Sequence, residues 1–417
     1  MSGPQNRADV IVIGAGIVGT TIGLALARKG REVLLVDRSA PGLACSRGNA
    51  GIIATSEIEP LVSYRTLVRL PALLLDPLGP LRISPRALYR LVPWFWRALR
   101  SAAPARRKQA AMILAALCEP ALDAHCRLLS TPERERLIRR NGMIDVIRKK
   151  GERPLIETRR RICQAHGIPV RTLNSSELAE LEPGLRPGLA GGLFHPDVAH
   201  VADPLDLVAT YADAFRQCGG RFQQGTAANL RATAEGAELS LDGHELGARH
   251  VVVAAGISSP SLLASYVKRE IPLAAERGYH MQLAEPGPPL MRPIMFSGDS
   301  FVATPLARGV RLAGTAEFAA EGEDPDWRRA EALFRSACAY LPGVSRAGAT
   351  LWMGARPTFP DSLPAIGTIG GTTIHYAFGH QHLGLTLSAV TAEMIAGMIE
   401  GCSRSPLLPY LSLERFA

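Results

Sequence analysis

Three glycines near the start of the chain have the spacing of a turn that binds a nucleotide phosphate. Gly14, Gly16 and Gly19 follow a short apolar run, residues 8–13, and precede residues 20–29, whose apolar positions have helical spacing. Gly14 permits a tight turn, Gly16 lets the backbone approach a pyrophosphate, and Gly19 allows strand and helix to pack closely. The helix N-terminus would face the phosphates. The pattern predicts a strand, a turn and a helix that bind a dinucleotide.

An acidic residue completes this pattern. Asp37 follows a second apolar run, residues 32–36, and lies 18 residues beyond Gly19. At the end of a strand, its carboxylate can accept hydrogen bonds from the ribose hydroxyls of the adenosine half of a dinucleotide. A glycine-rich turn without function is the alternative, but strand, helix and acid are all in register. We interpret the segment as a dinucleotide-binding βαβ unit.

The composition of the chain is that of a globular protein of about two domains. It has 417 residues, 47% hydrophobic and 20% charged, which excludes disordered, collagen-like and small disulfide-bonded classes. The seven cysteines are widely spaced and contain no Cys-x-x-Cys, so we expect reduced thiols and no metal site. Glycines interrupt the apolar residues 10–27 and a charged turn follows, so we expect no membrane-spanning helix, no signal peptide and a cytoplasmic location.

Positive charge is concentrated in one part of the chain. The net charge is +9, and residues 97–161 alone hold 17 Lys and Arg against 7 Asp and Glu. Such a segment can meet nucleic acid, an anionic membrane surface or only water. No nucleic-acid reader motif or aromatic platform accompanies it, so we expect no nucleic-acid partner.

An apolar and cationic segment overlaps the start of this region. Residues 61–99 carry six arginines and one acid, together with leucine clusters and Trp94-Phe95-Trp96. This combination suits a membrane interface, and we expect a peripheral contact with the inner face of the cell membrane. The alternative is a set of short helices that cover a second domain, with arginine stems lying over apolar surface. The two interpretations are compatible.

Further elements follow from the spacing of apolar and turn residues. A second block of the nucleotide domain is expected at residues 203–264, and Ser84-Pro85 indicates a sharp turn. We predict strands at 143–147, 221–224, 238–241, 249–253, 271–283 and 300–315, and helices at 324–340 and 387–399.

Three separated pieces of the sequence resemble one family. They are the N-terminal glycine pattern, Val251-Val-Val-Ala-Ala-Gly256, and a stretch from Gly354-Ala-Arg-Pro357 to Gly379-His-Gln-His-Leu-Gly384-Leu-Thr386. Together they resemble the FAD-dependent D-amino acid oxidase and dehydrogenase superfamily over nearly the whole chain, most of all the bacterial D-amino acid dehydrogenases. Cys45-Ser-Arg-Gly-Asn-Ala-Gly51 resembles the flavin-contacting loop of that subgroup, and Arg277-Gly-Tyr-His280 resembles a strand of its substrate domain.

The resemblance implies an α/β fold with a Rossmann-like FAD-binding domain of the glutathione-reductase βαβ type and an inserted α+β substrate domain. The implied FAD-binding domain is discontinuous, residues 7–58, 203–264 and 355–417, and the substrate domain comprises 59–202 and 265–354. A non-covalent FAD would lie with its isoalloxazine between them. The residues implied to bind FAD are Gly14, Gly16, Gly19, Asp37, Arg38, Ser46, Asn49, Ala50, Gly51, Ala255, Gly256, Gly379, Gly384, Leu385 and Thr386.

The resemblance also implies how the substrate carboxylate and the flavin are held. Arg356 lies in Gly-x-Arg-Pro, from which the family's carboxylate-binding arginine comes, and a planar guanidinium can grip a carboxylate at two points. A surface arginine before a turn proline is the alternative. The N-terminus of the helix at 387–399 would face the N1–C2 edge of the flavin, where backbone N–H groups and the helix dipole stabilise negative charge.

The chain departs from the family where it has Gln381 and His382 in place of small residues. We expect His382 to contact the substrate rather than to shuttle a proton, because a flavin amine oxidase can act on the neutral amine without a protein base. A structural hydrogen-bonding role for His380 and His382 is the alternative. Tyr279 and His280 are neighbours on a strand, so at most one of them faces the substrate. We favour Tyr279.

The implied reaction is the oxidation of a D-amino or cyclic imino acid by hydride transfer from Cα to flavin N5. The apolar and cationic segment at residues 61–99 leads us to expect that the electrons pass to a membrane quinone. D-Hydroxyproline and D-proline are candidates, because polar groups at residues 381–382 could recognise a ring hydroxyl. Two alternatives stay open. One is a glycine- or sarcosine-type secondary amine oxidase or dehydrogenase, and the other is a FAD-binding assembly subunit without turnover.

Overall fold

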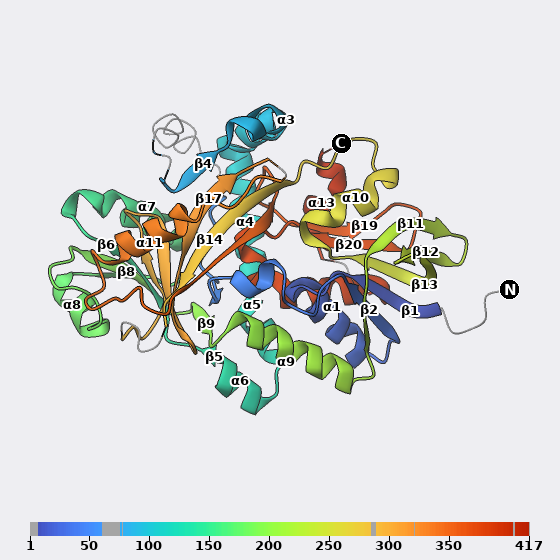
Figure 1. Cartoon of the computed structure of the whole chain (residues 1–417), viewed down its shortest axis with the longest axis horizontal. Helices are drawn as coiled ribbons and strands as arrows, with labels where there is room; N and C mark the ends of the chain where they lie inside the picture. Colours follow the sequence, from blue (N-terminus) through green and yellow to red (C-terminus); the bar gives the residue numbers. More distant parts are fainter. Residues whose placement is uncertain are drawn as a thin grey trace.

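The computed structural model of the protein describes residues 7–60, 76, 78–284, 289–320, 322–402 and 405–416. Two large β-sheets lie side by side, each flanked by helices (Figure 1). The sheet on the right of Figure 1, which we call the nucleotide sheet, has the strand order β10-β2-β1-β13-β12-β11, with β20 beside β13 and β19 beside β20. Its strands are β1 (Arg7–Ile13), β2 (Val33–Asp37), β10 (Arg221–Gln224), β11 (Ala227–Thr233), β12 (Gly236–Leu241), β13 (His244–Val253), β19 (Ala365–Thr368) and β20 (Ile374–Phe378).

The first residues of the chain form the centre of the nucleotide sheet. β1 pairs in parallel with β2 on one side and with β13 on the other, so that Ile11 lies between Leu34 and Val251. Apolar side chains of β1 enter both cores, as expected for a parallel strand covered on both faces. α1 (Ile17–Arg28) packs on α9 (Pro204–Gln217) and α12 (Gly384–Ile399). The predicted βαβ unit is confirmed, with its helix beginning at Ile17 rather than at residue 20.

The second large sheet, which we call the mixed sheet, has the strand order β18-β14-β17-β16-β15-β6-β8-β7, with β4 beside β17. α11 (Arg328–Ala337) packs on β14 and β17. The strands are β4 (Leu81–Ile83), β6 (Met143–Ile147), β7 (Arg171–Leu173), β8 (Gly191–His195), β14 (Ala274–Gln282), β15 (Ile294–Phe296), β16 (Phe301–Leu306), β17 (Gly309–Phe318) and β18 (Thr350–Thr358). A small sheet consists of β3 (Ile52–Ile53), β5 (Ile138–Arg139) and β9 (Ala199–Val201).

Further helices connect and cover the sheets. The α-helices are α3 (Pro85–Ser101), α4 (Pro104–Cys118), α5 (Ala121–Leu128), α6 (Thr131–Leu137), α7 (Arg153–Ala165), α8 (Ser175–Leu181), α10 (Ser259–Leu263) and α13 (Leu408–Leu411). The 3₁₀ helices are η2 (Cys45–Gly48), η3 (Lys150–Glu152), η4 (Gly256–Ser258), η5 (Ala264–Tyr266), η6 (Gln381–Leu383) and η7 (Leu413–Phe416).

Two parts of the structure cross the predicted domain limits. β18 continues to Thr358 in the mixed sheet and pairs with β14 along its whole length, so Arg356 lies in the mixed sheet although the predicted FAD-binding domain resumes at residue 355. Apolar residues between 110 and 138 pack in the same core as α1 and α12, although the sequence assigns them to the substrate domain. The predicted turn at Ser84-Pro85 is the start of α3, with Ser84 Oγ accepting from the N–H of Arg86 at 3.2 Å.

One helical stretch of the described chain, Gln381–Ile399, is long and apolar enough to cross a membrane, with a mean hydropathy of 1.3. However, 72% of its most apolar window is buried, which is the pattern of a core helix in the nucleotide domain. No group of three or more His, Cys, Asp or Glu side chains within the described residues could hold a metal ion.

Candidate active site

The glycine turn joins β1, α1 and β13. Gly14 has φ +108°, and a Cβ at this position would lie 2.4 Å from the carbonyl oxygen of Ala254. A Cβ at Gly19 would lie 1.7 Å from the carbonyl oxygen of Gly14, so neither glycine leaves room for a side chain. Gly16 is the N-cap of α1, and no side chain caps the helix there. The N–H of Ile17, the first residue of α1, donates to Ser46 Oγ. The remaining N–H groups of the first turn are available to a ligand, as an anionic phosphate requires.

Asp37 braces this turn from the end of β2. One carboxylate oxygen accepts a hydrogen bond from the N–H of Ala15 at 2.7 Å, and the other accepts one from Ser39 at 2.9 Å. The carboxylate lies beside the glycine turn, where a ribose would follow a pyrophosphate bound at the helix N-terminus. Arg38 is exposed, and its carbonyl accepts from Gln224 at 3.0 Å.

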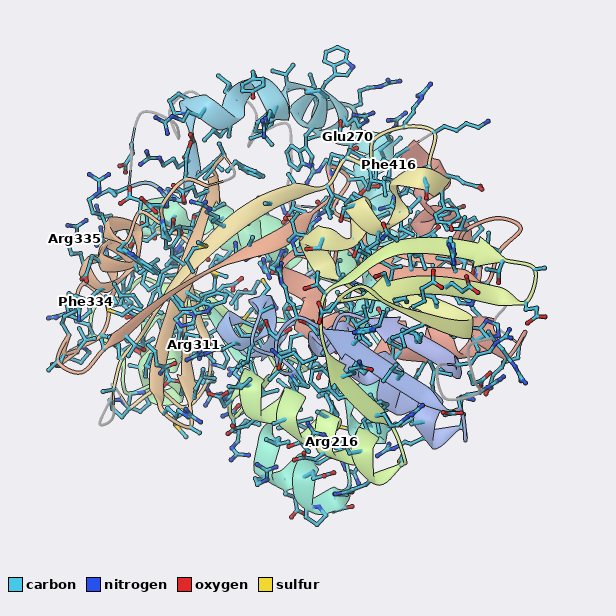
Figure 2. The ribbon with its side chains drawn as sticks, turned by 45° about the vertical axis from the view of Figure 1, so that its right-hand side comes forward. Arg216, Glu270, Arg311, Phe334, Arg335 and Phe416 are labelled. Atoms are coloured by element: carbon cyan, nitrogen blue, oxygen red, sulfur yellow. The ribbon has the colours of Figure 1, made fainter. Side chains whose placement is uncertain are left out.

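The loop of residues 45–51 is held from both sheets. On the nucleotide side, Ser46 Oγ accepts from the N–H of Ile17 at 2.9 Å. On the other side, Arg311 of β17 donates to the carbonyls of Arg47 at 3.1 Å and Asn49 at 2.6 Å. Figure 2 shows Arg311 on the mixed sheet. The loop therefore lies between the two sheets, and its carbonyls are engaged by the mixed sheet.

A histidine and a tryptophan complete that attachment. His280 of β14 places Nδ1 3.1 Å from the carbonyl oxygen of Gly48, and its ring stacks on Trp352 with centroids 5.1 Å apart. A Cβ at Gly48 would lie 1.9 Å from the Trp352 ring, so only glycine fits beneath it. Burial lowers the pKa of His280 to about 3, and the histidine is neutral at pH 7. Asn49 Oδ1 accepts from Gly51 at 2.8 Å and shapes the exit of the loop.

The stretch before α12 approaches from the nucleotide side. Gly379 has φ +80°, and a Cβ there would lie 2.1 Å from the ring of Phe359. Gln381 also adopts a positive φ, 53°. α12 begins at Gly384 without a side-chain cap, so its first N–H groups face outward from the helix end. Thr386 Oγ1 accepts from the N–H of Ala54 at 3.0 Å, which places Thr386 against the β3 segment.

The remaining predicted cofactor contacts are backbone positions. Ala255 is the N-cap of η4, which follows β13 and begins at Gly256 with φ +55°. Ala50 lies in the held loop, and Leu385 is buried with its carbonyl accepting from His125 Nε2 at 2.8 Å. These positions, the N-termini of α1 and α12 and Asp37 could hold an FAD, with α1 offering N–H groups to its pyrophosphate and α12 offering N–H groups to its ring.

Arg356 is held at one edge and open at the other. Its Nη1 donates to Glu276 Oε1 at 2.6 Å and to the carbonyl of Thr315 at 3.2 Å. The guanidinium lies across Gly278, where a Cβ would be 2.2 Å from Nη2. Within the described residues, no protein acceptor binds Nε or Nη2, and 23% of the side chain is exposed. The Nε–Nη2 edge is the one that binds a carboxylate at two points.

His382 lies between two ion pairs. Burial lowers its pKa; the negative charges of Glu57 and Glu276 raise it, whereas the positive charges of Arg356 and Arg159 lower it further. The net shift is downward, so His382 is neutral at pH 7. It belongs to η6 and is half-buried. His380, in contrast, bonds Thr391 Oγ1 at 3.0 Å in the core, as the structural alternative requires.

The second of these ion pairs was not predicted from the sequence. Arg159 of α7 donates to Glu57 Oε2 at 2.5 Å and lies 2.9 Å from Asp145 Oδ2, which also contacts His195 at 3.2 Å. Burial raises the pKa of Glu57, but the charge of Arg159 and the hydrogen bond from Arg159 outweigh it, so the pKa lies below its ordinary value. The pair brings the carboxylate of Glu57 near enough to His382 for its negative charge to raise the pKa of that histidine.

Glu276 also escaped the sequence analysis, which named Cys45 only as part of the flavin-contacting loop. Burial raises the pKa of the Cys45 thiol, while the charge of Arg356 lowers it and that of Glu276 raises it, which places Cys45 beside this ion pair. Strand alternation in the sequence could have indicated Glu276. Glu276 precedes Gly278 by two positions on β14, and residues two apart on a strand lie on the same face.

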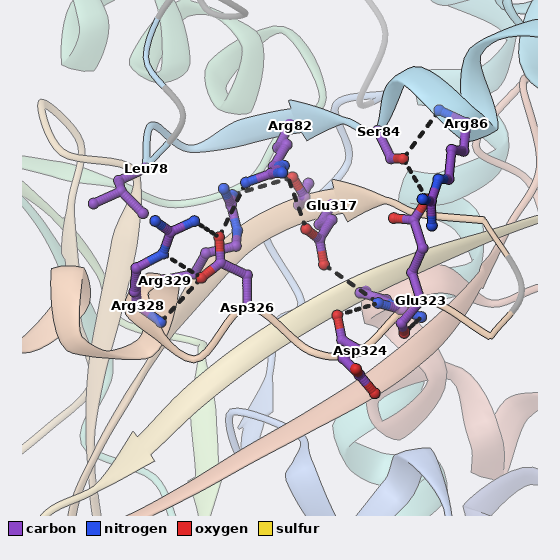
Figure 3. Close-up of polar contacts among 12 residues, drawn as sticks. Leu78, Arg82, Ser84, Arg86, Glu317, Glu323, Asp324, Asp326, Arg328 and Arg329 are labelled. Carbon is purple, nitrogen blue, oxygen red and sulfur yellow. Dashed lines mark hydrogen bonds and ion pairs between the residues drawn. The ribbon is translucent and has the colours of Figure 1, made fainter.

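The expectation that Tyr279 lines the substrate site is not met. Its hydroxyl donates to Glu317 at 2.5 Å and accepts from the N–H of Asp326 at 3.0 Å, on the opposite face of β14 from Glu276 and Gly278. Burial and the bond to Glu317 raise the pKa of Tyr279 to about 12. Figure 3 shows the ion pairs on that outer face. Strand alternation was the correct argument, but the face was chosen wrongly, because α11 packs on the Tyr279 side.

Comparison with known proteins agrees with this geometry. A family model described as FAD dependent oxidoreductase, DAO, matches residues 9–398. Relatives include a D-amino-acid oxidase of Bradyrhizobium diazoefficiens, 32% identical over 98% of this chain and 98% of the relative. A D-amino acid dehydrogenase of Cereibacter sphaeroides is 28% identical over 98% of this chain and 95% of the relative.

Among solved structures, glycine oxidase from Geobacillus kaustophilus is similar in fold, with a TM-score of 0.71 at 22% identity over 98% of this chain and 99% of that one. The implied α/β architecture, a nucleotide sheet beside a mixed sheet, is therefore confirmed. The chain belongs to the DAO family of FAD-dependent oxidoreductases.

Proposed function

We propose that the protein oxidises the Cα–N bond of a D-amino acid or a cyclic imino acid. The relatives named D-amino-acid oxidase and D-amino acid dehydrogenase support this substrate class, and they align with nearly all of the chain. The observation that carries the proposal is the open Nε–Nη2 edge of Arg356, next to a neutral His382.

Arg356 binds the substrate carboxylate in this proposal. Because Glu276 and the Thr315 carbonyl hold Nη1, the guanidinium keeps one orientation, and its free edge offers two parallel N–H donors. A two-point grip fixes the carboxylate, so the pocket decides which Cα substituent faces the cofactor. This orientation is the basis for discrimination between D and L substrates.

When bound, FAD supplies the two-electron acceptor, whose N5 takes the hydride from Cα. The backbone N–H groups of the first turn of α1 would hold this cofactor, and Asp37 would bind its ribose. The uncapped N-terminus of α12 favours negative charge at the ring, because its N–H groups and helix dipole are positive.

His382 binds the substrate as a neutral group. Its lowered pKa leaves one ring nitrogen as an acceptor and the other as a donor at pH 7, so it can bond a hydroxyl. The negative charge of Glu57, which Arg159 holds at one oxygen, acts on the same histidine, and Glu57 offers a second acceptor for a hydroxyl or an amine. These groups favour a polar substrate, and D-hydroxyproline, with D-proline as its unhydroxylated form, is our candidate.

We further propose a membrane quinone as the electron acceptor and a cytoplasmic location on the inner face of the membrane. The basic and apolar segment described above supports this part of the proposal. Oxygen is the competing acceptor, because one relative is named an oxidase.

A substrate panel under anaerobic conditions tests the function. Mixing the FAD-loaded protein with D-hydroxyproline, D-proline, their L forms and sarcosine should bleach the flavin rapidly with the D-imino acids. Faster bleaching by sarcosine or glycine would move the protein to the secondary-amine class, and no bleaching by any amine would favour an assembly subunit. Turnover with oxygen and with a ubiquinone analogue then compares the two acceptors.

The variant His382→Gly tests the substrate assignment within this panel. Loss of the imidazole should slow flavin bleaching by D-hydroxyproline relative to bleaching by D-alanine, because the hydroxyl of D-hydroxyproline loses a hydrogen-bond partner while the pocket gains space. An unchanged rank order of D-amino acids would remove His382 from substrate selection.

A further inference from the structure

We propose that the outward face of α3 binds the anionic surface of a lipid bilayer. We call this surface the α3 face, and it consists of Leu88, Tyr89, Val92, Trp96 and Leu99. These side chains are 51%, 67%, 58%, 61% and 45% exposed. Of the segment predicted to contact a membrane, residues 61–75 and 77 lie outside the described part of the chain, and the inference rests on α3 alone.

The inward face of α3 already has its partners. Trp94 is 6% exposed, packs on Phe318 with ring centroids 5.3 Å apart, and donates through Nε1 to the carbonyl of Thr358 at 3.1 Å. Ala87 and Ala98 are buried beside it. The packing of α3 on the mixed sheet is therefore satisfied without the α3 face, whose exposure has no structural purpose within the described chain.

The α3 face is a continuous stripe. Leu88, Val92, Trp96 and Leu99 follow one another at intervals of four, four and three residues, which places them on one side of an α-helix. In Figure 1, α3 is the outermost helix at the top of the molecule. A helix in this position can lie flat on a surface without a collision by the two sheets.

The positive charge around the α3 face indicates what kind of surface it binds. Residues 85–118, which span α3 and α4, contain seven Lys and Arg and no Asp or Glu. Arg86, Arg90 and Arg100 are exposed, and within the described residues none of them has a carboxylate partner. An apolar stripe bordered by unpaired cations is complementary to a bilayer, where apolar side chains enter the interface and cations meet anionic headgroups.

Two features favour lipid over a protein partner. Trp96 and Tyr89 are the residue types that concentrate at the level of the headgroups, with one end apolar and the other polar. Long arginine side chains can also extend from a partly immersed helix to the headgroups. A protein groove would need matching acids at the helix border, whereas an anionic bilayer offers negative charge at every position.

Vesicle binding tests the proposal with the intact, FAD-loaded protein. The probes are vesicles of phosphatidylcholine alone and of two parts phosphatidylcholine to one part phosphatidylglycerol. The wild type should sediment with the anionic vesicles and remain in solution with the neutral ones, and added salt should weaken the binding. Equal binding to both vesicles, or none to the anionic ones, would overturn the proposal.

Variants on the helix locate the contact. The double variant Val92→Ser, Trp96→Ser should bind anionic vesicles about tenfold more weakly, because two apolar side chains no longer leave water. The double variant Arg90→Gln, Arg100→Gln should bind more weakly at low salt and lose part of the salt dependence. Leu155→Ser on α7 is the matched control, since Leu155 is 41% exposed on another basic helix, and it should bind as the wild type does.

Two further outcomes would overturn the proposal that the α3 face binds lipid. Undiminished vesicle binding by Val92→Ser, Trp96→Ser would place the contact elsewhere. Self-association of the wild type that this variant abolishes, without lipid binding, would make a second copy the occupant. Flavin bleaching by substrate is measured on each variant in parallel, so a failure of the membrane contact is distinguished from a failure of the proposed function.

Discussion

Arg356 Nη1 lies 2.6 Å from Glu276 Oε1 on adjacent strands, and the register of β14 and β18 sets the two residues directly opposite each other. Glu276 is further fixed by Thr358, whose hydroxyl donates to Oε2 at 3.1 Å. The arrangement uses one edge of the guanidinium for orientation and leaves the other for an anion. The carboxylate therefore positions the arginine rather than neutralising its binding edge.

The first prediction concerns this arginine. Arg356→Lys should raise KM about tenfold or more and lower kcat, because an ammonium cannot reproduce a planar two-point grip. FAD content, read from the visible spectrum, should stay unchanged. Glu276→Gln is the control: its amide oxygen still accepts from Nη1, so its loss in kcat/KM should be smaller than that of Glu276→Ala. Wild-type kinetics in Arg356→Lys would remove this residue from the site.

The second prediction uses the contact between Arg356 and Gly278. A Cβ at Gly278 would lie 2.2 Å from Nη2, so Gly278→Ala should displace the guanidinium and raise KM in the same direction as Arg356→Lys. Gly247→Ala is a matched control on β13, where the nearest atom to the new Cβ is 3.8 Å away. Steady-state kinetics and thermal unfolding of both variants separate the two effects. A change in Tm without a change in KM would contradict the prediction.

Local sequence was sufficient for the nucleotide half of the site. The glycine turn, α1 and Asp37 interact within one βαβ unit, so their spacing along the chain already specifies their geometry. The ends of β1, β2 and β10 in that sheet also lie within one residue of those predicted, whereas β12 and β13 begin before their predicted ranges. No strand was predicted at β11, β19 or β20. β11 escaped prediction because it is mostly exposed, and an exposed strand has little apolar periodicity to detect.

The substrate half of the site could not be predicted in the same way, because its geometry depends on contacts between segments that are far apart in the sequence. Glu276 meets Arg356 only through pairing of β14 with β18, and Glu57 meets Arg159 across 102 positions of sequence. No periodicity in one strand reports the register of another. Tyr279 shows the same limit: alternation divides β14 into two faces, but the packing of α11 decides which of them faces away from the cofactor.

The third prediction is a pH dependence at His382. Substrate binding requires its neutral form in our proposal, so kcat/KM should fall on the acid side as His382 becomes protonated, at a pH below the ordinary histidine pKa. Glu57 raises the pKa of His382, and Glu57→Gln should therefore move this acid limb to still lower pH. pH profiles with a D-imino acid at fixed ionic strength measure the shift. If the fall of kcat/KM on the acid side occurs at the same pH in Glu57→Gln, in His382→Asn and in the wild type, a group other than His382 causes it.

The fourth prediction concerns stability in acid. His125 is buried; its Nε2 donates to the carbonyl of Leu385 at 2.8 Å, and its Nδ1 accepts from the Tyr211 hydroxyl at 2.7 Å. Burial lowers its pKa to about 4, against an ordinary value near 6.5. The unfolded chain therefore binds a proton that the folded protein does not, so the contribution of His125 is complete above pH 6.5 and is lost as the pH falls toward 4.

The stability that His125 loses in acid is large enough to measure. Between pH 6.5 and about 4.5, each pH unit removes about 1.4 kcal/mol from the free energy of unfolding, or roughly 2–3 kcal/mol in all. Urea unfolding of wild type and His125→Gln at both pH values isolates this part, because other buried histidines titrate in both proteins. The variant should be less stable at pH 7 but should lose less stability on acidification. Parallel losses in the two proteins would contradict the assignment.

The last prediction concerns how the mixed sheet holds the cofactor loop. Arg311 is 6% exposed and donates to the carbonyls of Arg47 and Asn49, so its removal leaves two buried acceptors without a donor. The loop between them is implied to contact the flavin, and Ser46 within it also binds the start of α1. Arg311→Met should therefore raise the Kd for FAD by roughly ten- to a hundredfold, since hydrogen bonds from a charged donor contribute about 1.5–3 kcal/mol each and His280 still holds Gly48. Arg308→Met, on the exposed turn before the same strand, is the matched control and should bind FAD as the wild type does. Titration of the deflavinated proteins with FAD measures both affinities, and the flavin freed by acid should be unmodified FAD. Equal affinities in the two variants would show that the loop keeps its conformation without the mixed sheet.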